Sequence, residues 1–207
     1  MPWEPPDDAR TAERLSDWWL GTCRKFARHE RFFVALGWGE RLSRLFAVAC
    51  CRAAFGKRMK AQSRELVGVA ERFADGLATE QELIAAADSL FDEATPIADQ
   101  PAAVVVSMTP HYAAGWMAAQ KRHRELFGKI LRAMVGPEMR WSDGWRTDTL
   151  VALARGIYDE QSWDRMPILS DALQEAGCDD HRVIGYCRGE GPFCRGCWLL
   201  DTILQKR

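Results

Sequence analysis

Apolar residues are spaced as in helices along almost the whole chain. In 40–55 they recur at positions i, i+3, i+4 and i+7, the pattern of a helix that buries one stripe. The stripe consists of Leu42, Leu45, Phe46, Ala49, Cys50 and Ala53. Only Val104-Val105-Val106 suggests an extended segment. The sequence therefore predicts an all-α fold, one compact domain of about seven to eight helices.

Residues that favour helix starts punctuate these stripes. Thr79-Glu80-Gln81-Glu82 has the form of a capping box and predicts a helix that continues to about residue 91. Thr147 and Asp179 are predicted N-caps, because their side-chain oxygens accept hydrogen bonds from first-turn amides. Pro167 suits the first turn of a further helix, where its missing N–H costs little.

The order of these segments predicts how the chain is organised. Residues 1–100 are expected to form an N-terminal helical layer, and 101–138 a central helix with its connector. The central helix is predicted over about 110–134 and ends before Gly136-Pro137. Residues 139–207 are expected to form a C-terminal helical unit with a cysteine-rich loop.

Composition narrows the classes of function. The 207 residues include 47% apolar and 28% charged residues, with a net charge of −1. This balance is typical of a soluble globular protein and argues against nucleic acid as a partner, because phosphate binding needs a basic surface. The sequence has no long apolar run and no signal-peptide pattern. We therefore expect a cytoplasmic protein with no membrane partner, whose partner is another protein.

Four of the seven cysteines lie close to the C-terminus around a Gly/Pro-rich loop. They are Cys178, Cys187, Cys194 and Cys197. In a chain without an export signal, such crowding favours thiols or a metal over structural disulfides. A structural zinc, a redox pair and simple packing of small apolar side chains all remain open.

The zinc interpretation names Cys187, Cys194 and Cys197 as ligands, since the C-x-x-C spacing provides half of a tetrahedral site. The fourth ligand is unknown; Cys178 or Cys51 is possible, as are Cys23 and a histidine. If 179–187 is helical, Cys178 and Cys187 are separated by about 13 Å along the axis. They are then too far apart to be ligands together.

The redox interpretation rests on Cys197, which precedes a predicted helix and follows Arg195. Helix N-terminal amides and a nearby cation lower the pKa of a thiol, so this cysteine would be reactive. A thioredoxin-like site, however, requires a βαβ unit that an all-α chain lacks. In the packing interpretation, cysteines such as Cys50 behave as small core residues.

Several longer blocks resemble a family of uncharacterised bacterial proteins that occur as paralogues in planctomycete genomes. The blocks are Leu45-Phe46-Ala47-Val48-Ala49-Cys50-Cys51-Arg52, the segment 69–79 (VAERFADGLAT), Ile157-Tyr158-Asp159-Glu160, 167–173 (PILSDAL), Ala176-Gly177-Cys178-Asp179 and Arg195-Gly196-Cys197-Trp198. The resemblance implies a helical protein of unknown activity. It also implies His at positions 186 and 193 and a residue other than cysteine at 194, where this chain has Tyr186, Phe193 and Cys194.

Two functional hypotheses follow. The first is a non-enzymatic helical interaction or scaffold module with a structural zinc at the C-terminal cysteines. The alternative is an enzyme that uses these cysteines, either a thiol oxidoreductase or a zinc-dependent hydrolase. In either case Asp171 and Asp201 are expected to pair with Arg188 or Arg195.

Overall fold

The computed structural model describes residues 37–91, 100–105, 121–137 and 139–206, together with Phe33, Pro110, Ala113, Ala114 and Met117. Within these residues every regular element is a helix and no strand occurs, which confirms the predicted all-α class. No helix in this part of the chain is both long and apolar enough to cross a membrane.

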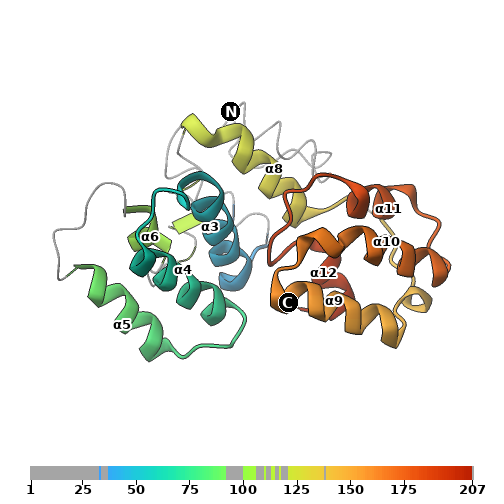
Figure 1. Ribbon diagram of the computed structural model, residues 1–207, viewed down its shortest axis with the longest axis horizontal. Helices are drawn as coiled ribbons and strands as arrows, with labels where there is room; N and C mark the ends of the chain where they lie inside the picture. The colour runs from blue at the N-terminus through green and yellow to red at the C-terminus, as the bar shows by residue number, and fades with distance from the viewer. Residues whose placement is uncertain are drawn as a thin grey trace.

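The first group of helices surrounds α3. Its members are α3 (Glu40–Phe55), α4 (Ala61–Ala74), α5 (Glu80–Phe91), α6 (Gln100–Val105) and α8 (Arg124–Val135). Helix α3 packs on α4, α6 and α8, and α4 also contacts α5 and α6 (Figure 1). The buried residues of this group form one apolar core, which includes Leu45, Phe46, Val67, Phe127 and Ile130.

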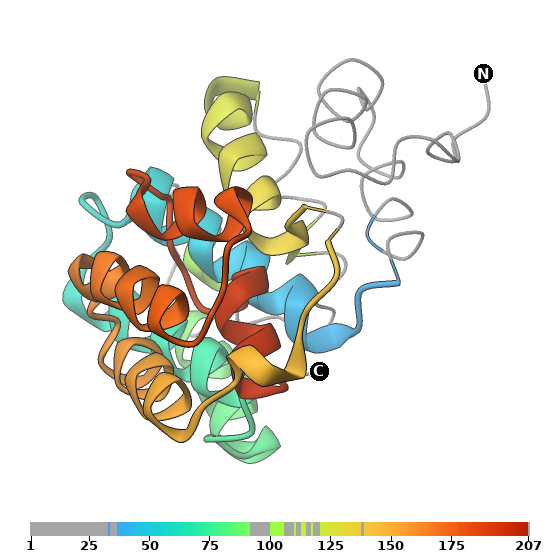
Figure 2. The same cartoon turned by 90° about the vertical axis from the view of Figure 1, so that its right-hand side faces the viewer.

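The second group of helices is arranged around α9 and α10. It contains α9 (Asp148–Glu160), α10 (Met166–Glu175), α11 (His181–Arg188) and α12 (Trp198–Leu204). Helix α10 packs on α9 and α11, while α12 packs on α9 and also contacts α8. Figure 2 shows α12 on the side of this unit that faces α3 and α8. The buried residues of this second group form a second apolar core. The divisions of the chain that the sequence predicts near residues 100 and 138 stay predictions.

The helix starts follow local chemistry. Thr79 Oγ1 accepts from Glu82 N at 3.2 Å and Glu82 Oε2 accepts from Thr79 N at 2.7 Å, so the capping box is confirmed. Thr147 Oγ1 accepts from Leu150 N at 3.2 Å, as predicted. Pro167 lies in the first turn of α10. The predicted cap at Asp179 is wrong by one residue, because it is Asp180 that accepts from Arg182 N at 2.9 Å.

Two of the three consecutive valines differ from their predicted conformation, and Val106 lies outside the described residues. Val104 and Val105 belong to helix α6, not to an extended segment. Val105 is buried in the first core, and its carbonyl accepts a 3.0 Å hydrogen bond from the guanidinium of the buried Arg44. Packing and this bond outweigh the weak helix propensity of valine.

The central helix is confirmed at its C-terminal end. Helix α8 ends at Val135 and is followed by Gly136, as the sequence predicted. Its described part begins at Arg124 after a 3₁₀ turn, Lys121–His123, and much of the predicted start near residue 110 lies outside the described residues.

Candidate functional site

A network of buried charges joins the two groups of helices, and Asp75 lies at its centre. Its side chain is completely buried at the C-terminal end of α4. Asp75 accepts hydrogen bonds from Arg41 Nε at 3.1 Å and from the Tyr158 hydroxyl at 2.8 Å. Arg195 Nη1 and Lys206 Nζ lie 3.7 and 3.6 Å from its oxygens. This one carboxylate thus contacts side chains from α3, from α9, from the 189–197 loop and from the residues that follow α12.

Arg41 extends the network to α12. Its two Nη atoms donate to both carboxylate oxygens of Asp201, at 2.6 and 3.1 Å, and Nη2 also donates to the Tyr158 hydroxyl at 2.9 Å. Burial alone would lower the pKa of Arg41, but Asp201 and its neighbours outweigh it and raise the pKa. Burial raises the pKa of Asp201, although the bonds from Arg41 act in the opposite direction.

Tyr158 acts in this network as a neutral donor. Burial raises the pKa of its hydroxyl well above the usual value, and the hydrogen bond to Asp75 adds to that effect. Its ring is also contacted by cations, with Lys206 Nζ at 4.5 Å and the Arg195 guanidinium at 5.3 Å from the centroid. Such cation–π contacts stabilise a desolvated positive charge.

Glu71, one helical turn before Asp75, forms the second branch. Arg52 Nη1 donates to it at 3.0 Å and Gln161 Nε2 at 2.8 Å. Arg52 Nη1 also donates to the Gln161 amide oxygen at 3.1 Å. Gln161 is the C-cap of α9 and adopts the left-handed conformation, with φ 55°. This branch therefore ties α3 and α4 to the end of α9.

The predicted pairs of Asp171 and Asp201 are only partly right. Arg188 Nη2 donates to Asp171 at 3.0 Å, as expected, and both side chains are largely exposed. Asp201, however, pairs with Arg41. Arg195 instead donates to the backbone carbonyls of Tyr158 and Asp159.

The blocks that carry the family resemblance meet in this network. Arg52 ends the first block, Glu71 and Asp75 lie in the second, Tyr158 in the third and Arg195 in the last. The sequence interpretation did not single out Glu71 or Asp75. Their spacing of four residues, on one face of a helix with a buried stripe, was the signal that could have revealed them.

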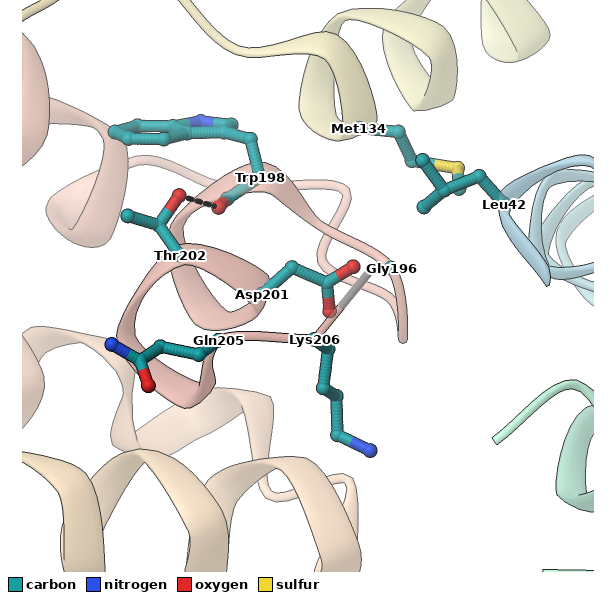
Figure 3. Close-up of a pocket in the computed structure, with 8 residues that line it drawn as sticks. All are labelled: Leu42, Met134, Gly196, Trp198, Asp201, Thr202, Gln205 and Lys206. Carbon is teal, nitrogen blue, oxygen red and sulfur yellow. Dashed lines mark hydrogen bonds between the residues drawn. The ribbon is translucent and has the colours of Figure 1, made fainter. Parts of the chain in front are cut away.

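Two hollows flank the network. The first, of about 590 Å³, is lined by Leu42, Met134, Gly196, Trp198, Asp201, Thr202, Gln205 and Lys206 (Figure 3). The second, of about 280 Å³, lies between the two apolar cores, beside the branch of the network that Glu71 forms. Its lining consists of Leu45, Ala49, Arg52, Ala53, Glu71, Ile130, Gln161, Trp163, Pro192, Phe193, Cys194 and Arg195.

The structure distributes the candidate zinc ligands over different surroundings. Cys187 and Cys197 are buried in the second core, as is Cys178. Cys194 packs against the first core and lines the second hollow. Cys51 is buried on α3, with its thiol 3.7 Å from the sulfur of Met59.

No group of three or more metal-ligating side chains is arranged around a common point in the described ranges. Cys23, one candidate for the fourth ligand, lies outside them. The zinc site at Cys187, Cys194 and Cys197 stays a prediction, which zinc analysis and a thiol count of the purified protein would check.

The thiols in the part of the chain that the structure describes are not activated. Burial raises the pKa of Cys197 to about 11, and that of Cys187 and of Cys51 to about 12. The Leu200 amide at the start of α12 does act to lower the pKa of Cys197, but burial outweighs it. The lowered pKa expected for this cysteine is therefore wrong. Neutral thiols are poor nucleophiles, which counts against the redox hypothesis.

These thiol pKa values predict a loss of stability at alkaline pH. Their folded values lie above the ordinary value of 9.0, so the unfolded chain releases the protons first as the pH rises. The stabilisation is complete below about pH 9 and falls up to about pH 12, by up to about 1.4 kcal/mol per pH unit for each thiol. Urea denaturation across this range, with a reductant present, measures the slope.

The variant Cys187→Ala isolates one thiol. Its cavity lowers the stability at every pH, but its slope above pH 9 should be shallower by about 1.4 kcal/mol per pH unit. Equal slopes for the variant and the wild type would show that this thiol does not cause the effect.

Tyr186 and Phe193, which stand where the resemblance implies histidines, are in contact with each other. The rings of Tyr186 and Phe193 meet edge to face, with centroids 5.4 Å apart.

Comparison with known proteins finds no relative: no family model, no curated protein and no solved structure matches the chain. The resemblance to the planctomycete family stays a prediction.

Proposed function

We propose that this protein is a cytoplasmic, non-enzymatic helical module that binds another protein at the first hollow, between α3, α8 and α12. The observation that carries this proposal is the composition of the hollow. Leu42 and Met134 lie on one side of it, Trp198 lies on another, and Gln205 and Lys206 lie at the opposite end (Figure 3). Tryptophan and methionine are enriched where proteins bind one another, and a polar rim around an apolar centre is the usual arrangement.

The surroundings of the hollow favour a preformed site. Asp201 lies in its wall and is held by two hydrogen bonds from Arg41. Thr202 Oγ1 donates to the carbonyl of Trp198 at 2.7 Å. A wall that is fixed before the partner arrives loses little conformational entropy on binding, so more of the contact energy appears as affinity. The hollow is therefore suited to receive an apolar side chain of a partner protein.

The substitution Gln205→Trp tests this site. Gln205 is exposed beside the hollow, and a tryptophan there would occupy the space that the partner needs. We expect the partner that co-purifies with the wild type to bind at least about tenfold more weakly, a loss typical of an interface centre. Quantitative affinity purification with cross-linking at the hollow measures the loss.

Gln81→Trp provides the matched control, because Gln81 is an exposed position on α5, away from both hollows. It should keep the partner, and both variants should keep the helical circular dichroism of the wild type. Equal retention of all co-purifying proteins by the two variants would refute the proposed site.

A further inference from the structure

The second hollow differs from the first in the charge of its lining. Two guanidinium groups, those of Arg52 and Arg195, line it together with one carboxylate, that of Glu71. Gln161 contributes a neutral amide. These lining groups have one positive charge in excess, next to apolar walls. The same excess holds for the whole network, which contains Arg41, Arg52, Arg195 and Lys206 against Glu71, Asp75 and Asp201. The hollow's volume of about 280 Å³ lies just below the usual range for pockets that bind drug-sized molecules, so it suits a small ligand.

Arg52 leaves part of its hydrogen-bonding capacity unused. Both of its hydrogen bonds, to Glu71 and Gln161, come from the same atom, Nη1. Its Nε and Nη2 groups have no acceptor among the described residues, and the side chain is 35% exposed. A guanidinium presents its N–H groups as a planar fork, which fits the two oxygens of a carboxylate.

Arg195 adds positive charge without competing for the same ligand. Its Nε and Nη2 bind backbone carbonyls, which fix the guanidinium. Its Nη1 lies 3.8 Å from Glu71 and 3.7 Å from Asp75, beyond the length of a good hydrogen bond. Glu71 would repel a ligand with two negative charges, whereas a single negative charge would neutralise the excess.

The rest of the lining is apolar and comes from both cores. Ile130 of α8 and Ala49 of α3 belong to the first group of helices. Trp163 and Phe193 belong to the second. An apolar ligand group that fills this space would contact both groups of helices at once and would link the two cores.

From the charge and shape of this hollow we propose that it binds a small monocarboxylate with an apolar body. The carboxylate pairs with the guanidinium of Arg52, and the apolar part of the ligand packs between Ile130, Trp163 and Phe193. This site is separate from the protein-binding hollow, and the inference does not depend on that function. It makes the module one that responds to a small acid.

Calorimetric titration with 3-phenylpropionate, compared with its neutral amide, tests the ligand class. We expect the acid to bind at least about tenfold more tightly than the amide, the effect of one charge-assisted hydrogen bond. The acid should also slow the modification of Cys194, the half-buried thiol in the same lining. No binding at millimolar concentration, or equal binding of acid and amide, would overturn the proposal.

Substitutions at two positions locate the site. Arg52→Gln should weaken binding of the acid at least about tenfold and leave the amide unchanged, with Arg52→Lys intermediate because it keeps the charge but not the fork. Ala49→Phe should abolish binding of both by filling the space. The control Arg165→Gln removes an exposed guanidinium that pairs with Glu160 and should bind as the wild type does. If Arg52→Gln and Ala49→Phe bind the acid unchanged, the site is wrong.

Discussion

Replacing Asp75 by Asn is expected to lower the free energy of unfolding by about 3–5 kcal/mol, the usual result of removing one partner from a buried charge network. The substitution keeps the size of the side chain but removes a completely buried negative charge. Three positive charges lie within 4 Å of this carboxylate, those of Arg41, Arg195 and Lys206. Without its negative charge, their mutual repulsion is less well balanced. Urea denaturation followed by tryptophan fluorescence measures the loss.

The exposed pair of Arg188 and Asp171 provides the control, because it has the same chemistry without burial. Its atoms are 3.0 Å apart, but the side chains are 50% and 65% exposed. Asp171→Asn should therefore change the stability by at most about 1 kcal/mol. Equal effects of the two substitutions would mean that burial does not make the Asp75 network important.

Gly136→Ala is expected to be similarly damaging, for a steric reason. Gly136 has φ 73° and ψ 173°, a region of backbone conformation that is essentially restricted to glycine. A Cβ atom there would lie 2.4 Å from Cγ of Trp198. The strain and the displaced indole should together cost about 2–5 kcal/mol, measured by urea denaturation.

Gly156→Ala is the matched substitution with the opposite expected sign. Gly156 lies inside α9, and a Cβ atom there would meet nothing within 4 Å. Alanine should stabilise the helix by up to about 1 kcal/mol, because it restricts the unfolded chain and favours helix. A comparable loss of stability in both variants would contradict the role assigned to the contact between Gly136 and Trp198.

The roles of the cysteines could not be predicted from the sequence, because they depend on tertiary packing. The spacing of Cys194 and Cys197 suggested two thiols that act together. In the structure the chain turns at Gly196, with φ 83°, where a Cβ atom would approach Met134 and Leu45 within 3.0 Å. Cys194 then packs against the first core and Cys197 in the second. Which core each thiol meets depends on elements far away in the sequence.

The sequence by itself determined the helical class, the capping box at Thr79, the cap at Thr147 and the end of α8 at Gly136. Each of these depends on residues within a few positions, through apolar periodicity or a local hydrogen bond. Only the tertiary structure decided the partners of the buried charges. Arg41 and Asp201 are 160 positions apart, and Asp75 and Tyr158 are 83 apart. No local pattern relates such residues, because what brings them together is the packing of two apolar cores.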